Sequence, residues 1–323
     1  ASSETSVGTQ LPLQSQVNIT GLAVHLGAGS TVLAPNARVT VSAGVWDYLL
    51  NANEGRNQFV RSAGQVFMDS GAMIDVAGST DVAVAMAQYI LSVELRGAEL
   101  ADAPVQRTGV LRGPTLTVDL RQTGTYNGKS WVGTPLADLA GYVGLVQRTA
   151  GELTADGGSV SISAGESVVM QPGSIVDVSG GFLNYEGGFI EPTRVIQGGR
   201  LVPIAEAMPD QVYDGIYTGT FTTGSSRWGV TETYAIPWMS GRHYEAGYVH
   251  GAAGGSVSIQ APAMAIDGEL RGNTVTGPRQ REANPVMSSL TLKFTGETLI
   301  QSGQPAVTIS PTPPAITFAE DSQ

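Results

Sequence analysis

Residues Met68–Gly78 read MDSGAMIDVAG, and residues Met170–Gly180 read MQPGSIVDVSG. The two segments share the methionine, the first glycine and an Asp-Val-x-Gly ending. In each segment apolar residues flank the aspartate, and because side chains alternate along a strand, the apolar pair points to one face and the aspartate to the other. The glycine that follows allows the chain to turn. The repeated segment therefore predicts short strands within a repeat architecture.

Other stretches repeat in a similar way. Gly157–Ile162 and Gly254–Ile259 both read GGSVSI, and Leu33–Gly44, LAPNARVTVSAG, follows a looser version of the first scheme, with Thr40 facing out. Strands this short do not form a stable hairpin sheet alone, whereas stacked coils bury their inward valines and isoleucines in one column. We therefore expect an all-β fold, a right-handed parallel β-helix with extra-helical excursions.

An antiparallel β-sandwich is the alternative fold, since it also has short strands and glycine turns. A sandwich predicts many two-residue hairpin turns of the Asn-Gly or Asp-Gly type. Such dipeptides are scarce, which favours the β-helix; they are Asn127-Gly128, Asp156-Gly157, Asp214-Gly215 and Asp267-Gly268.

Composition agrees with short strands and frequent turns. The 323 residues include 42 glycines, and charged residues make up 14%, against a usual value of about 25%. The chain has no cysteine, which excludes disulfides and thiolate metal sites, and its net charge of −11 argues against nucleic acid as a partner. It has no apolar run long enough for a transmembrane segment, and the first residues, ASSETSVGTQ, do not form a signal peptide, so we expect an internal segment.

The pattern is interrupted twice. One interruption holds a predicted helix over 134–146, with Thr134 as N-cap and Pro135 as its first residue. The other concentrates 11 of the 21 aromatic residues. The predicted order is β-helix coils in 1–78, coils with an insertion in 79–151, coils in 152–181, an aromatic-rich excursion in 182–250, coils in 251–305, and a Pro-rich tail or linker in 306–323.

Three stretches carry a family resemblance. Val93–Arg107 (VELRGAELADAPVQR), Gly151–Val160 (GELTADGGSV) and His243–Val257 (HYEAGYVHGAAGGSV) resemble segments of filamentous haemagglutinin-type exoproteins of Gram-negative bacteria. The resemblance extends over residues 60–260, and the ELRGAELADAPVQR stretch is its most specific part. The Asn-Pro-Asn motifs of the family's secretion domain do not occur here, so we expect a segment downstream of that domain.

The resemblance implies a function as well as a fold. Such proteins leave the cell by two-partner secretion, through an outer-membrane transporter, and fold outside it as right-handed β-helices. It therefore implies a secreted or cell-surface scaffold or adhesin that attaches to host cells, other bacteria or biofilm matrix. The family brings no catalytic residue and no cofactor, and a passive spacer that carries a distant toxin or binding domain is an alternative.

The aromatic-rich excursion is the candidate binding region. Aromatic faces combine apolar area with polar tips, which suits a glycan or a surface protein as partner. The alternative is that the rings only pack the excursion together. The candidate residues are Tyr213, Tyr217, Trp228, Tyr234, Trp238, Tyr244 and Tyr248.

Metal and catalytic sites are less well supported by the sequence. His243, Glu245 and His250 have side chains that bind zinc, and stacked Asp75 and Asp177 have the chemistry for calcium, but no further ligand stands at a suitable spacing. We therefore expect no metal site. A polysaccharide-cleaving β-helix enzyme, a lyase or hydrolase, is the alternative function, and it would need clustered acidic residues. The candidate catalytic residues are dispersed along the chain, so we expect no enzyme. These candidates are Asp69, Asp75, Asp177 and Arg194.

Overall fold

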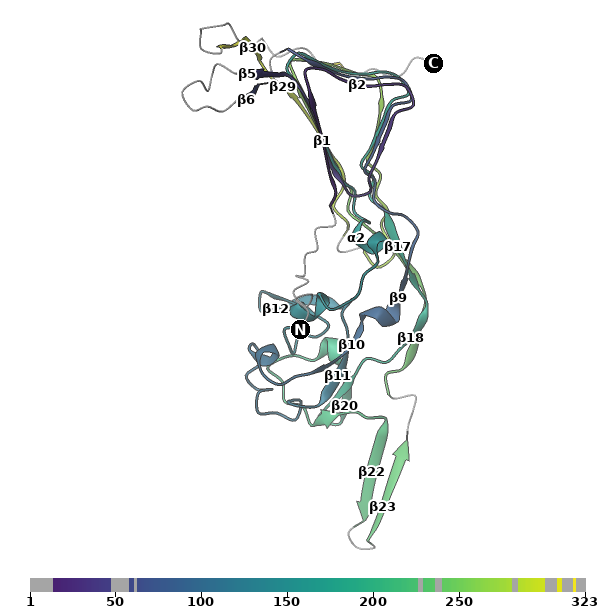
Figure 1. Ribbon diagram of the computed structural model, residues 1–323. Coiled ribbons are helices and arrows are strands. Elements are labelled where there is room, and N and C mark those ends of the chain that lie inside the picture. Colours follow the sequence, from purple (N-terminus) through teal and green to yellow (C-terminus); the bar gives the residue numbers. More distant parts are fainter. Residues whose placement is uncertain are drawn as a thin grey trace, which may run out of the picture. The chain divides into compact units, whose positions relative to one another are not determined.

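The computed structural model describes residues 14–47, 58–60, 63–225, 229–235, 240–280, 284–299, 307–309 and 316–317 (Figure 1). Strands predominate there and the helices are short, which confirms the prediction of an all-β chain. The chain divides into two compact units. The described residues of Ala83–Arg148 and Asn184–Tyr248 form unit 1, and those of Leu13–Val82, Thr149–Leu183 and Val249–Gln323 form unit 2.

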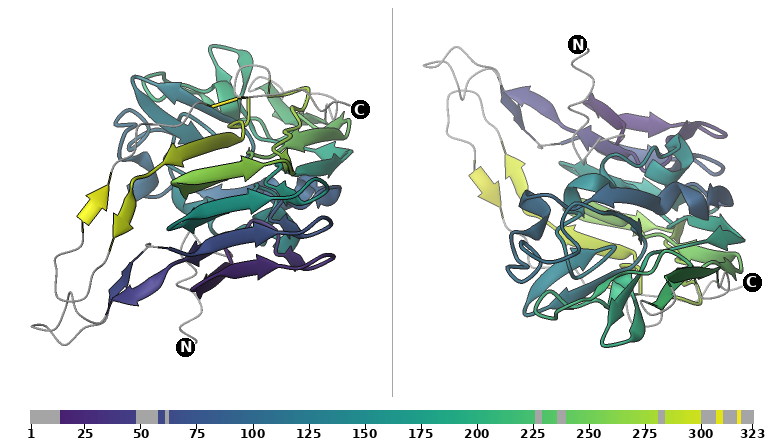
Figure 2. Two further views of the ribbon diagram at one scale, coloured as in Figure 1. Left: turned by 90° about the horizontal axis from the view of Figure 1, so that it is seen from above. Right: turned by 90° about the horizontal axis from the view of Figure 1, so that it is seen from below.

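Unit 2 contains three parallel sheets, which the chain visits in turn on successive passages (Figures 1 and 2). Sheet one, as far as it is described, has the order β1 (Gln16–Gly21), β4 (Arg38–Ala43), β14 (Ser159–Ala164), β26 (Ser256–Ala261) and β29 (Ser289–Phe294). Sheet two has β2 (Val24–Leu26), β7 (Gln65–Met68), β15 (Ser167–Met170) and β27 (Ala263–Ile266). Sheet three has β3 (Thr31–Leu33), β8 (Met73–Asp75), β16 (Ile175–Asp177) and β28 (Glu269–Arg271).

The repeats found in the sequence lie side by side and in register. Met68 pairs with Met170 in sheet two, and Asp75 pairs with Asp177 in sheet three. The two GGSVSI segments meet in sheet one, where β14 pairs with β26 residue by residue. All of these pairs are parallel, so the antiparallel ladders of a sandwich are absent from these strands. A one-residue slip would turn every inward side chain outward, which is why the pattern specifies the register.

The looser repeat Leu33–Gly44 does not lie in register with Met68–Gly78. Leu33 ends β3 and pairs with Asp75 in sheet three, whereas Val39 belongs to β4 in sheet one. Between them the chain turns at Asn36, whose φ of 55° lies in the left-handed region that asparagine tolerates. The segment is therefore a corner between two sheets.

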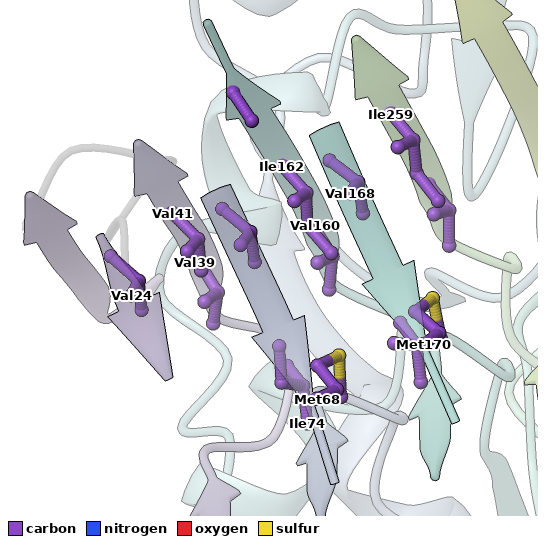
Figure 3. Packing of buried hydrophobic residues seen from close by; sticks show 14 of the residues in the cluster. Val24, Val39, Val41, Met68, Ile74, Val160, Ile162, Val168, Met170 and Ile259 are labelled. Carbon is purple, nitrogen blue, oxygen red and sulfur yellow. The ribbon is translucent and has the colours of Figure 1, made fainter. Parts of the chain in front are cut away.

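The inward residues of the strands form the core of unit 2 (Figure 3). Val39 and Val41 are fully buried, and Thr40 between them is only half-buried, as the alternation predicts. Each fully buried Val or Ile contributes roughly 1.5–3 kcal/mol relative to an exposed one. The residues labelled in the core are Val24, Val39, Val41, Met68, Ile74, Val160, Ile162, Val168, Met170 and Ile259.

Two glycines show how closely successive passages approach. A Cβ on Gly158 would lie 2.2 Å from the carbonyl oxygen of Ala37, and one on Gly255 would lie 1.9 Å from that of Gly158. Neither glycine has a positive φ. The GGSVSI glycines are therefore required by backbone contact between passages rather than by a turn conformation.

Unit 2 also has elements outside its three sheets. Antiparallel pairs are formed by β5 (Val45–Asp47) with β6 (Gln58–Val60), and by β30 (Glu297–Leu299) with β31 (Val307–Ile309). The single helical turn α2 (Ala150–Leu153) begins with a capping box, in which Thr149 Oγ1 accepts from Glu152 N and the Glu152 carboxylate accepts from Thr149 N.

Unit 1 is built from antiparallel pairs of strands. The sequence predicted further coils with an insertion in 79–151, and the strands within 90–132 form antiparallel pairs. The pairs are β10 (Ile90–Glu94) with β11 (Thr115–Asp119), β12 (Thr123–Tyr126) with β13 (Lys129–Val132), β18 (Gly188–Ile190) with β24 (His243–Glu245), β19 (Arg194–Gln197) with both β20 (Arg200–Pro203) and β21 (Gly215–Ile216), and β22 (Thr220–Ser225) with β23 (Val230–Ala235). Short 3-10 turns are η2 (Met86–Tyr89), η3 (Ala98–Leu100) and η4 (Ile204–Glu206). The chain passes between the units in β9 (Val82–Ala85), β17 (Phe182–Glu186) and β25 (Tyr248–Gly251).

The predicted helix over 134–146 is reduced to one turn, α1 (Ala140–Val143). Thr134 does not cap a helix; its buried hydroxyl donates to the Ile204 carbonyl oxygen and accepts from the Leu136 amide. Leu136 is buried in the core of unit 1, which favours an irregular, packed segment. Gly141 and Gly144 further lower the helix propensity.

The core of unit 1 is separate from that of unit 2, and its buried residues come from both of the segments that form the unit. Leu95, Leu111 and Leu116 of the first segment share this core with Val195 and Ile204 of the second. The two interruptions of the repeat therefore fold together. No helix in the described part of the chain is long and apolar enough to span a membrane.

Candidate functional site

The candidate aromatic residues are divided between the interior and the surface of unit 1. Tyr213 is buried in the core, and its hydroxyl donates to the Met208 carbonyl oxygen at 3.0 Å. Burial raises the pKa of this phenol. Tyr213 therefore has a packing role in unit 1. Such a role was the alternative to ligand binding for these aromatic residues.

Tyr248 has a similar structural environment. Its ring stacks on that of Tyr185, with centroids 4.8 Å apart and an interplanar angle of 15°. Arg121 donates to the Tyr248 hydroxyl at 3.2 Å, and its guanidinium carbon lies 5.7 and 5.9 Å from the centroids of Tyr185 and Tyr248. The ring pair thus packs against a buried cation.

A buried ion cluster surrounds Arg121. Its Nε and Nη2 atoms donate to the two Asp119 carboxylate oxygens at 3.0 and 2.8 Å, and Nη1 and Nη2 donate to those of Glu245 at 3.0 and 2.8 Å. The side chains of Arg121, Asp119 and Glu245 are only 7, 3 and 9% exposed. Burial acts to lower the pKa of Arg121, but bonds to Glu245 and Asp119 raise it above its usual range.

This cluster joins residues 124 positions apart, and the sequence analysis missed it. A bidentate guanidinium–carboxylate pair holds two planar groups in a defined geometry. Arg121 forms two such pairs, one with Asp119 and one with Glu245. The cluster therefore fixes β24 against the end of β11. The local spacing to Asp119 does not distinguish Arg121 from exposed arginines, because Arg96 and Arg271 have an acid at the same spacing and lie at exposed sites. The second partner of Arg121, Glu245, is remote in the sequence.

The exposed aromatic residues come from the antiparallel pair β18–β24. Phe189 and Tyr244 are cross-strand partners, 63 and 60% exposed, with ring centroids 5.4 Å apart in an edge-to-face arrangement. The guanidinium carbon of Arg242 lies 5.0 Å from the Phe189 centroid. Since side chains alternate, Tyr244 faces out while its neighbour Glu245 faces the ion cluster.

A cavity of about 480 Å³ adjoins this surface. Phe189 and Tyr217 line it, together with Thr218, Thr193 and the carboxylate-bearing Glu191. The Thr193 hydroxyl already accepts from the Thr117 amide at 2.7 Å. Aromatic walls with a few hydroxyl and carboxylate groups suit a ligand that has apolar faces and polar edges. We refer to Phe189, Tyr217, Arg242 and Tyr244 as the β18–β24 surface.

The remaining candidates are not placed at this surface. Trp228 and Trp238 lie outside the described residues. Tyr234 belongs to β23, where it pairs with Phe221. The structure therefore brings Tyr217 and Tyr244 to one region through Phe189. It buries Tyr213 in the core and stacks the half-buried Tyr248 on Tyr185.

The histidine and carboxylate candidates have other partners. Glu245 binds Arg121, and His243 Nδ1 lies 2.7 Å from the Gly241 carbonyl oxygen. His250 lies near Gln280, with Nε2 of each residue 3.4 Å apart. Within the described residues no three His, Cys, Asp or Glu side chains are grouped to hold a metal ion.

The acids named for catalysis have local partners. Asp75 and Asp177 each accept a hydrogen bond from the amide two residues further on. Asp69 Oδ2 lies 2.9 Å from His25 Nε2 and accepts from the Ala28 amide at 3.1 Å. Arg194 belongs to unit 1 and the three acids to unit 2. These contacts stabilise turns between strands.

Comparisons with known proteins identify no relative. No family model matches the chain, and searches of the curated proteins and of the solved structures find no match. The function is therefore inferred from the chain's own residues.

Proposed function

We propose that unit 2 is a segment of a right-handed parallel β-helix, and that it acts as a scaffold in a secreted or surface-displayed bacterial exoprotein of the filamentous haemagglutinin type. In-register pairing of successive strands in three parallel sheets supports the fold. Backbone hydrogen bonds in such a stack run between passages along one direction, which makes a stiff support.

Unit 1 is the adhesive part in this proposal. It is formed by two excursions from the scaffold, and binding residues are commonly carried by loops on a rigid support. The observation that carries the assignment is the β18–β24 surface, where two exposed rings and Arg242 stand beside a cavity. Its partner is a glycan or a protein on a host cell, a neighbouring bacterium or biofilm matrix.

The test is binding of the fluorescently labelled full chain to epithelial cells and to bacterial cells. We expect saturable binding, and we expect Phe189→Ala and Tyr244→Ala each to weaken it at least ten-fold. Met287→Ala, which removes an exposed apolar side chain of unit 2, should bind as the unaltered chain does.

Three results would count against the proposal. Absence of saturable binding favours a passive spacer, and binding that survives both ring substitutions removes the β18–β24 surface from the interaction. Release of reducing or unsaturated ends from acidic or neutral polysaccharides would favour a polysaccharide-cleaving enzyme.

A further inference from the structure

A second cavity in unit 1, of about 560 Å³, shares no lining residue with the first. It lies beside the hairpin β12–β13, and we call it the Trp131 cleft. Its volume is within the range of about 300–1,000 Å³ that is usual for small-molecule sites. Its aromatic and charged lining residues, together with one amide, are Tyr126, Trp131, Asp102, Lys129, Asp138 and Asn127.

The hairpin holds the Trp131 ring in a defined place. Trp131 is the cross-strand partner of Gly124, and a Cβ on Gly124 would lie 2.5 Å from Cζ2 of the indole. The indole thus lies against the glycine backbone, and because Trp131 is half-buried and lines the cleft, it presents the rest of its surface to the cavity. Asn127 and Gly128, both with positive φ, form the tight turn that brings Tyr126 to the same cavity.

The base of the cleft is apolar and built from the interior of the unit. Pro135, Leu136, Ala137 and Pro209 are buried and line it. Because Leu136 also belongs to the core of unit 1, the base is supported by packed side chains. A ligand in the cleft therefore meets an aromatic wall and an apolar base.

Polar groups lie at the rim. Lys129 Nζ donates to Asp102 Oδ1, so the charges of these two residues balance. Asp138 Oδ1 accepts from the Ala140 amide at 3.0 Å, and in the described part of the chain no donor is found for its Oδ2. The Asn127 amide, the Ser130 hydroxyl and this carboxylate oxygen supply donors and acceptors within one cavity.

We infer that the Trp131 cleft binds a neutral carbohydrate, a mono- or disaccharide unit of a glycan. A pyranose ring has an apolar C–H face that packs on an indole and hydroxyls that bond to carboxylate, amide and ammonium groups at its edge. This site is independent of the β18–β24 surface, and either one can bind without the other.

Charge argues against other ligand classes. An anionic sugar would meet Asp138 and Asp102 in a chain whose net charge is −11. An organic cation would meet the Lys129 ammonium at the same rim, beside the carboxylate that Lys129 already neutralises. A neutral ligand with both donors and acceptors requires no change in these pairs.

The experiment is a screen of the full chain on an array that holds neutral, anionic and cationic glycans, followed by titration calorimetry with each disaccharide that binds. We expect neutral glycans to be retained, with affinity unchanged between 0.05 and 0.5 M NaCl, because salt screens charged contacts only. Trp131→Ala and Asp138→Asn should each weaken binding at least ten-fold.

Two further variants test the position of the indole and provide a control outside the cleft. Gly124→Ala displaces the indole without removing it and should weaken binding in the same direction, whereas Met287→Ala, at an exposed residue of unit 2, should leave it unchanged. Retention of only anionic or only cationic glycans, the absence of any retained glycan, or equal binding by Trp131→Ala and the unaltered chain would each overturn the inference. Loss of binding in Tyr244→Ala alone would assign the sugar to the β18–β24 surface instead.

Discussion

The two units of the chain contain the same kinds of strand but different kinds of core. Within the described residues, the buried cluster of unit 2 consists of Val, Ile, Met and Ala, with no leucine, whereas leucine is the commonest residue in that of unit 1. β-Branched residues suit the pleated strands of a repeated stack, and longer flexible side chains fill the irregular spaces between unrelated turns. Unit 2 is therefore stabilised by repetition, and unit 1 by contacts that occur once.

Polar interactions differ in the same way. Unit 1 contains the buried Arg121 cluster, which links β24 to the end of β11. In unit 2 the ion pair between Arg271 and Glu269 joins residues of one strand, β28, and lies at the surface. A repeated stack specifies its own register, whereas unit 1 needs a specific link between its two segments. Substitutions in each unit test this difference.

The largest effect is expected from Val176→Asp in the stack. Val176 is fully buried in sheet three, between Ile74 and Leu270 of the neighbouring strands, so the change places an unpaired carboxylate in the core. We expect a loss of more than about 4 kcal/mol in the free energy of unfolding of unit 2, measured by denaturant titration.

Thr40→Asp is the matched control, because Thr40 is half-buried and faces away from the core. Its cost should stay within about 0.5 kcal/mol. Equal costs at Thr40 and Val176 would show that the inward and outward faces are assigned incorrectly.

Arg121→Ala should have the next largest effect, and in the other unit. The change leaves the carboxylates of Asp119 and Glu245 buried without their partner, which costs about 3–5 kcal/mol. Hydrogen exchange followed by mass spectrometry should show faster exchange in 83–148 and 184–248 and unchanged protection in the three sheets of unit 2.

Arg96→Ala is the control for charge removal, since Arg96 pairs with Glu94 at an exposed site. It should leave exchange unchanged in both units. If Arg121→Ala accelerated exchange equally in unit 2, the two units would not be separate folding units.

The smallest effect concerns pH and His250 of unit 2. Burial lowers the pKa of this imidazole from its ordinary value of 6.5, and the charge of Asp156 only partly opposes the shift. Below about pH 6.5 the unfolded chain therefore binds a proton that the folded chain does not, so the free energy of unfolding should fall as the pH is lowered through this range. Above it, His250 is neutral in both states and contributes no pH dependence.

Thermal unfolding between pH 5 and 7.5 measures this effect. His250→Gln should flatten the profile of unit 2, whereas His243→Gln, a change at an exposed residue of unit 1, should preserve it. A profile that is equally steep with and without His250 would mean that other groups cause the dependence.

The candidate binding region was only partly predictable. The concentration of aromatic residues in 182–250 included Tyr217 and Tyr244, but it did not distinguish them from Tyr213, which the fold buries, or from Tyr248, which stacks on Tyr185 beside Arg121. Trp131 lies in the other segment of unit 1, where no concentration of aromatic residues points to it. Aromatic side chains serve in cores and in binding sites alike, so their composition does not separate the two roles.

Turn dipeptides show a similar limit. Asn127-Gly128 forms the two-residue turn between β12 and β13, as the hairpin rule predicts. Asp267-Gly268, which has a similar sequence, instead lies between β27 and β28, which belong to different sheets. The dipeptide permits a tight turn, and the neighbouring strands decide whether it closes a hairpin.

The sequence by itself determined the strands of the repeated segments and their inward faces. It also determined the pairing of Met68–Gly78 with Met170–Gly180 and of one GGSVSI segment with the other. The period of two is a local property, and equal segments bury equal side chains when they lie in register. Only the tertiary structure decided that the segments on either side of 149–183 fold together as unit 1, with Arg121 bound to Glu245. That contact depends on which remote surfaces meet, and no spacing within either segment encodes it.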